Sequence, residues 1–119
     1  SDSVLIIDPI AKTADTTTIT GLTGDYKWGG GVLGPDGKIY GIPSNSDSVL
    51  IIDPIAKTAD TTTITGLPGD GYGGWYSGVL GPDGLIYGIP AYAESVLIIA
   101  GGIPTMPIEP LLSPYLNKY

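Results

Sequence analysis

Residues 1–22 read SDSVLIIDPIAKTADTTTITGL and recur without a single change as residues 46–67. Residues 32–43, VLGPDGKIYGIP, recur at 79–90 with one substitution, and a third, shortened copy begins at Ser95 with SVLII. The period is 45 residues between the first two copies of SVLII and 47 between the second and the third. Length differences confined to one loop are typical of stacked structural repeats. Identity over 22 residues favours a recent duplication, or a consensus or designed sequence.

One period holds four segments typical of short β-strands. They are residues 29–34, 38–43, 48–53 and 61–66, the last rich in threonine. The Pro-Asp-Gly sequence between the first two predicts a tight turn, because proline presets φ and glycine accepts positive φ. Nothing in the period repeats every 3.6 residues, as an amphipathic helix would. The sequence therefore predicts an all-β chain of four-stranded antiparallel units, with no helix beyond a turn.

The strand SVLIID is apolar at successive positions, which predicts that both of its faces are covered. Sheets stacked face to face achieve this, and four strands in 40–50 residues is the period of a propeller blade. The combination of GGVLxPDGKIYGIP with SVLIIDP resembles the repeats of β-propellers, in the neighbourhood of the NHL, kelch and streptogramin-lyase-like groups. This resemblance covers residues 1–99 and implies propeller-type blades, about two per chain.

On this interpretation the chain divides into four segments. Residues 1–22 form a partial blade with its last two strands, 23–66 a complete blade, 67–99 a partial blade with three strands, and 100–119 a proline-rich C-terminal tail. Propellers have at least four blades, so two and a fragment cannot close a ring. We expect a homo-oligomer or an open head-to-tail assembly, or else a fragment of a longer protein. Residues 3–20 of one copy would complete the blade that another begins, in competition with that copy's residues 95–99.

The composition excludes several classes of function. The chain has no His, Cys or Arg, which removes a Ser-His-Asp triad, a cysteine nucleophile and thiolate metal sites. A net charge of −7 argues against nucleic-acid binding, and no apolar run approaches the roughly 20 residues of a membrane span. We therefore predict no catalytic residues, no metal and no cofactor. A fragment of a propeller lactonase or lyase-like enzyme is the alternative that the resemblance admits.

In four-stranded antiparallel blades the loops between the second and third strands, and between successive blades, share one end. Aromatic and carboxylate side chains on glycine-rich loops suit the binding of carbohydrate or another polar ligand. The alternative is that the two tryptophans fill the gaps between blades. The candidate ligand-binding residues at this end are Asp25, Tyr26, Trp28, Asn45, Asp47, Asp70, Tyr72, Trp75 and Tyr92.

Two other groups of polar residues have local explanations. Asp8, Asp36, Asp53 and Asp83 lie at turns, where aspartate usually accepts hydrogen bonds from its own turn backbone. Dense threonine near proline is an O-glycosylation signal in secreted proteins, and it favours an extracellular filament subunit as an alternative function. The candidate glycosylation sites are Thr16, Thr17, Thr18, Thr61, Thr62 and Thr63.

Overall fold

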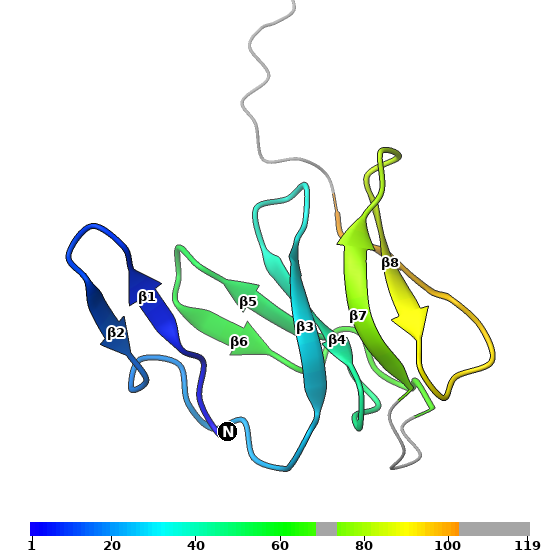
Figure 1. The fold of residues 1–119 in the computed structure, drawn as a ribbon, viewed down its shortest axis with the longest axis horizontal. Coiled ribbons are helices and arrows are strands. Elements are labelled where there is room, and N and C mark those ends of the chain that lie inside the picture. The colour runs from blue at the N-terminus through cyan, green and yellow to red at the C-terminus, as the bar shows by residue number, and fades with distance from the viewer. Residues whose placement is uncertain (69–73, 103–119) are drawn as a thin grey trace, which may run out of the picture.

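The computed structural model describes residues 1–68 and 74–102, and within these ranges the chain is all-β, without helices. The strands form three antiparallel sheets that follow one another along the chain (Figure 1). The first sheet pairs β1 (Ile6–Asp8) with β2 (Thr13–Asp15). The middle sheet has the order β3 (Trp28–Leu33), β4 (Ile39–Pro43), β5 (Leu50–Asp53) and β6 (Thr58–Asp60). The third sheet contains β7 (Trp75–Leu80), β8 (Leu85–Pro90) and β9 (Leu97–Ala100).

The Pro-Asp-Gly turns that the sequence predicts join β3 to β4 and β7 to β8. In the first of them Gly37 has a φ of 84° and its N–H donates to the carbonyl of Gly34 at 3.0 Å. The carboxylate of Asp36 accepts from the N–H of Lys38 at 3.1 Å, which closes the turn. Asp83 accepts from Leu85 in the same way in the third sheet. The expectation that these aspartates serve their own turns is confirmed.

The fourth strand of the unit lies earlier than the sequence predicts. We expected residues 61–66, but β6 spans Thr58–Asp60 and pairs with Ile51–Asp53. The strand ends there because the Asp60 carboxylate accepts from the backbone N–H and the hydroxyl of Thr62, and from Thr63 as well. Such local side-chain hydrogen bonds compete with the sheet ladder. Asp15 ends β2 in the same manner.

The third sheet repeats the first three strands of the middle sheet in the same register. Val32 pairs with Tyr40 and Tyr40 with Ile51, as Val79 pairs with Tyr87 and Tyr87 with Ile98. Both sheets also carry an irregularity after the tryptophan that opens them. Residue 100 is alanine where the middle sheet has Asp53, and β9 ends there as β5 ends at Asp53. Among the described residues the third sheet holds three strands.

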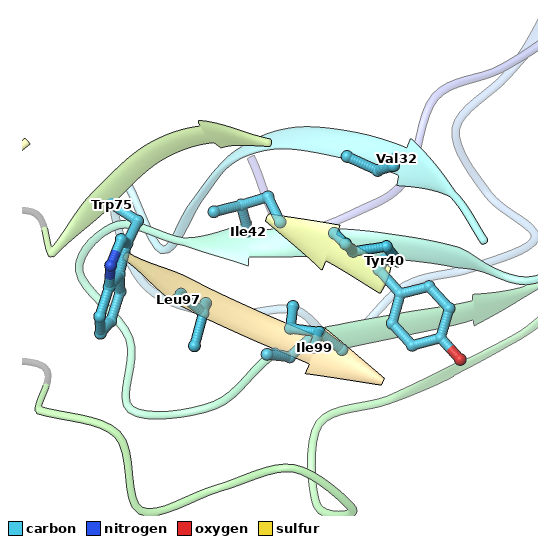
Figure 2. Close-up of a cluster of buried hydrophobic side chains, with 8 residues drawn as sticks. Val32, Tyr40, Ile42, Trp75, Leu97 and Ile99 are labelled. Atoms are coloured by element: carbon cyan, nitrogen blue, oxygen red, sulfur yellow. The ribbon is translucent and has the colours of Figure 1, made fainter. Parts of the chain in front are cut away.

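The middle and third sheets pack face to face around one apolar cluster (Figure 2). We call the face of the middle sheet that bears Val32, Tyr40, Ile42, Val49 and Ile51 its forward face, because cross-strand partners and alternate residues share a face. The third sheet covers it with the opposite, backward face, which carries Ile86, Leu97 and Ile99. Ile42, Val49 and Ile86 are completely buried.

Glycines let the two sheets approach closely. A Cβ atom on Gly78 of β7 would lie 2.8 Å from two side-chain carbons of Ile42, and one on Gly29 of β3 would lie 2.5 Å from the carbonyl oxygen of Tyr76. At Gly29 the close neighbour is backbone, so only glycine fits there, whereas at Gly78 a methyl group would have to displace the Ile42 side chain. The neighbouring first strands of the two sheets are therefore in near backbone contact.

The two outer sheets do not follow the prediction that both faces of SVLII are covered. Leu50 is buried and Ile51 and Ile52 are half-buried in the middle sheet, as expected. In the first sheet Leu5 and Ile7 are exposed, and in the third sheet Val96 and Ile98 are exposed. The SVLII sequence is the same in all three sheets, so the difference in exposure depends on which sheet has a neighbouring sheet on both faces.

Candidate functional site

The candidate ligand-binding residues lie at one end of the stack. In Figure 1 the β1–β2, β3–β4, β5–β6 and β7–β8 turns lie at the upper end of the sheets, and the β4–β5 turn and the connections between sheets lie at the lower end. Three hollows lie beside these lower loops, and the described candidate residues other than Asn45 line one or another of them. Asp70 and Tyr72 fall outside the described residues. The structure thus brings the candidates to one end without joining them in one site.

The largest of these three hollows has a volume of about 650 Å³ and lies between the first and middle sheets. Asp25, Tyr26 and Trp28 line it together with Val4 and Leu50. Tyr26 is 87% exposed and has a φ of 53°, which holds the loop in the left-handed region. An aromatic ring, an indole and a carboxylate around one hollow form the arrangement expected for a polar ligand.

Both tryptophans are held by their own sheets. The indole N–H of Trp28 donates to the carbonyl of Ser48 at 2.9 Å, and that of Trp75 donates to the carbonyl of Ser95 at 2.8 Å. Trp75 is only 4% exposed and belongs to the apolar cluster, where it fills the space between the middle and third sheets. Trp28 is half-buried, with the Lys27 ammonium 5.8 Å from its ring centroid. Trp75 therefore fits the alternative in which a tryptophan fills the gap between two sheets.

The remaining candidates are separate. Asp47 and Trp28 border a second hollow of about 260 Å³, whereas Tyr92 and Trp75 border a third of about 360 Å³. Asn45 is half-buried, and its backbone N–H donates to the carbonyl of Tyr26 at 3.0 Å. Its role in the loop is therefore to join two connections through the backbone.

The carboxylates serve turns rather than a common centre. Asp8 accepts from the backbone N–H groups of Ala11 and Ile10, and these bonds lower its pKa. Asp53 is held in the same way by Ala56 and Ile55, with the same effect on its pKa. Across residues 1–68 and 74–102 no three His, Cys, Asp or Glu side chains come together as a cation site would require.

The threonine clusters flank the ends of β2 and β6. The Thr18 hydroxyl donates to the Asp15 carboxylate and, with Thr17, lowers the pKa of that carboxyl to about 2. Thr63 and Thr62 do the same for Asp60. These hydroxyls are exposed but already engaged as donors, whereas Thr16 and Thr61 make no such bond among the described contacts. O-glycosylation of the six threonines stays a prediction.

The sequence predicts open faces that leave VLII-type strands uncovered, and the two ends of the stack carry such apolar surfaces. On the forward face of the third sheet, Val79 is 57% exposed, Ile89 46% and Ile98 58%. On the backward face of the first sheet, Leu5 is 56% exposed and Ile7 63%. Contiguous apolar surfaces of this kind mark interaction sites. Most of these exposed residues have a buried counterpart in another sheet, as Ile89 has in Ile42 and Ile7 has in Ile99, whereas Ile98 corresponds to the half-buried Ile51.

Comparison with known protein families, with curated proteins and with solved structures finds no match to this chain. None of the elements in the described part of the chain is a helix long and apolar enough to cross a membrane.

Proposed function

We propose that the three sheets are propeller-type blades and that the chain is a non-enzymatic repeat module that assembles with further copies of itself into a scaffold. The observation that carries the proposal is the exposed forward face of the third sheet. Its residues repeat, in sequence and in register, a forward face that the middle sheet keeps buried. The absence of His, Cys and Arg from the sequence supports a role in binding or scaffolding rather than in catalysis.

The apolar surface gives the energetic reason for assembly. Burying a Val, Leu or Ile side chain is worth roughly 1.5–3 kcal/mol, and several such side chains are exposed at each end of the stack. The two ends are different surfaces, so their contact is heterologous and adds copies head to tail. The assembly is closed if the rotation per copy completes a ring and is otherwise a filament.

Light scattering over a range of concentrations tests the proposal. We expect a molar mass that rises toward multiples of 12.2 kDa, and we expect Ile89→Lys to reduce it, because the new charge lies in the forward face of the third sheet. Ile55→Lys is the matched control, since Ile55 is 92% exposed on the β5–β6 turn. A monomer at every concentration, or equal effects of the two variants, would contradict the proposal.

Carbohydrate binding is a second candidate, favoured by the hollow that Asp25, Tyr26 and Trp28 share. A glycan array with the unmodified chain and with Tyr26→Ala tests it, because Tyr26 is exposed and its ring is the accessible stacking surface. Binding that the variant loses supports this function. Binding that the variant retains, or no binding at all, contradicts it.

A further inference from the structure

We propose that copies of this chain join by strand exchange: the β7–β8 hairpin of one copy completes the first sheet of a second copy, whose β1–β2 hairpin replaces β9 of the first. The inference rests on the proposed self-assembly and goes further, because it specifies which strands meet and assigns β9 the role of an internal substitute for β1. Three independent observations lead to it.

The first observation is that the first sheet, as described, lacks apolar residues whose counterparts are exposed on the third sheet. The apolar cluster between the middle and third sheets has eight buried members, including Val32, Tyr40 and Ile42 from the middle sheet's first two strands. The first sheet, as described, has no counterpart of these three, because it consists of β1 and β2. The hollow of about 650 Å³, which Val4 and Leu50 line, lies between the first sheet and the middle sheet.

The residues that correspond to these three lie on the third sheet. By the repeat, Val79, Tyr87 and Ile89 correspond to Val32, Tyr40 and Ile42, and they lie on the forward face, where Val79 and Ile89 are exposed. A β7–β8 hairpin placed beside β1 of a second copy would bring these side chains against that copy's middle sheet. Val79 would change from 57% exposed toward the 8% of Val32, and Ile89 from 46% toward the 0% of Ile42.

The second observation is that β9 and β1 are interchangeable in sequence. Residues 95–99 and residues 3–7 both read SVLII. In β9, Leu97 and Ile99 are 9% and 3% exposed because they pack on the middle sheet, whereas their counterparts Leu5 and Ile7 are 56% and 63% exposed. A β1 strand in the place of β9 would bury Leu5 and Ile7 in the same pocket positions.

The exchange also adds a strand. Among the described residues the ladder of the third sheet ends at β9, whereas β1 carries β2 with it across the Asp8 turn. With the β1–β2 hairpin of a second copy in place, the blade has four strands in the order of the middle sheet. The carbonyl of Ser3 would then accept from the Trp75 indole, as the carbonyl of Ser95 does within the chain.

The third observation concerns what retains β9. The Tyr40 hydroxyl donates to the carbonyl of Gly101 at 2.7 Å, and a Cβ atom on Gly101 would lie 3.2 Å from the Tyr40 ring. Pro9 is the residue of the β1–β2 hairpin at this position, so the exchange displaces the Tyr40 ring slightly. The β9 strand thus fits its place and, being in the same chain, has a high effective concentration. The β1–β2 hairpin of a second copy competes with it and brings one more strand. Assembly is consequently concentration-dependent, with β9 as the competitor.

Opposite effects of equivalent substitutions test the exchange. Ile7→Asp alters a residue exposed in the single copy, so the fold is retained and we expect self-association to fall at least tenfold. Ile99→Asp weakens β9, so we expect self-association to rise instead. Light scattering gives the association, and circular dichroism checks that each variant keeps its β structure. Association without exchange predicts that Ile99→Asp lowers self-association, because it damages the third sheet.

Cross-linking gives a readout that does not depend on Ile99→Asp folding. Exchange places Ile6 of one copy opposite Tyr87 of the other, the position that Ile98 occupies within the chain. Directly paired antiparallel residues have Cα atoms about 4.5–5.5 Å apart, which suits a disulfide. The chain has no cysteine, so the double variant Ile6→Cys, Tyr87→Cys under mild oxidation should give disulfide-linked dimers and larger species. The control is Ile6→Cys with Ile55→Cys.

The outcomes separate the inference from the proposed function. A monomer at every concentration overturns both. Association without a 6–87 cross-link above the control level overturns strand exchange and leaves face-to-face assembly in place. Association with that cross-link, reduced by Ile7→Asp, supports exchange.

Discussion

At the scale of single residues, Tyr40 and Tyr87 are the same repeat position in two environments. The Asp36 carboxylate and the carbonyl of Gly101 share the single proton of the Tyr40 hydroxyl, which lies within hydrogen-bond distance of both, and the residue is 4% exposed. Tyr87 donates to Asp83 in an exposed setting. Tyr40→Phe should lower the free energy of unfolding by about 1–3 kcal/mol, because it leaves the buried carbonyl of Gly101 without a donor. Urea unfolding of both variants tests this, with Tyr87→Phe as the control of smaller effect; equal effects would contradict the role of Gly101.

Asp60 and Asp15 make the free energy of unfolding depend on pH in the acid range. Hydroxyl and backbone donors hold the pKa of each at about 2, below the usual 3.8. A lowered folded-state pKa contributes stability that is present above the unfolded value and is lost as pH falls through the folded value. We therefore expect the urea midpoint to fall between about pH 4 and pH 2. Thr63→Val should raise the pKa of Asp60 in an NMR titration, whereas an unchanged pKa would show that the Thr63 hydroxyl is not the main donor.

At the scale of elements, glycines in β3 and β7 set the distance between the middle and third sheets. Gly78 lies against Ile42, and an added methyl group would overlap it at 2.8 Å, whereas the equivalent atom on Gly31 would meet Ile39 at 3.3 Å. Gly78→Ala should therefore destabilise the chain by about 1–3 kcal/mol, the usual range for overpacking a core.

Gly31→Ala is the matched control, since it changes the corresponding residue of the middle sheet. Thermal unfolding monitored by circular dichroism should show the larger loss for Gly78→Ala. The reverse order would mean that the backward face of the middle sheet is packed more tightly than the junction with the third sheet.

At the scale of the whole molecule, the junction that we propose between copies would differ from the junction within the chain. Gly29 allows β3 to approach the backbone of β7, but the corresponding residue of β7 is Tyr76, which is 71% exposed. A second copy's β3 placed at the same distance would meet the Tyr76 side chain. We expect Tyr76→Gly to strengthen self-association, seen as a lower dissociation constant in sedimentation analysis. Tyr92→Gly, in an exposed loop, should have no such effect, and weaker association of Tyr76→Gly would show that the ring contributes to the contact.

The candidate site divides between what the repeat predicts and what it does not. The period and the loop positions place Asp25, Tyr26 and Trp28 together at one end, and the structure has them around one hollow. The burial of Trp75 depends on the sheet that precedes it, so the loop sequence alone did not distinguish it from Trp28. The placement of the fourth strand failed for a similar reason, because the carboxylate of Asp60 turns the threonine segment away from the ladder.

The sequence by itself determined the local structure of this protein. Identical repeats with Pro-Asp-Gly turns and β-branched runs specify hairpins, because turn geometry and strand propensity depend on neighbours along the chain. Tertiary structure alone decided which of these identical segments is buried. Ile7 is 63% exposed and Ile99 is 3% exposed within the same SVLII strand. Burial depends on which sheets lie on either side, and that is a property of the stack that no single repeat contains.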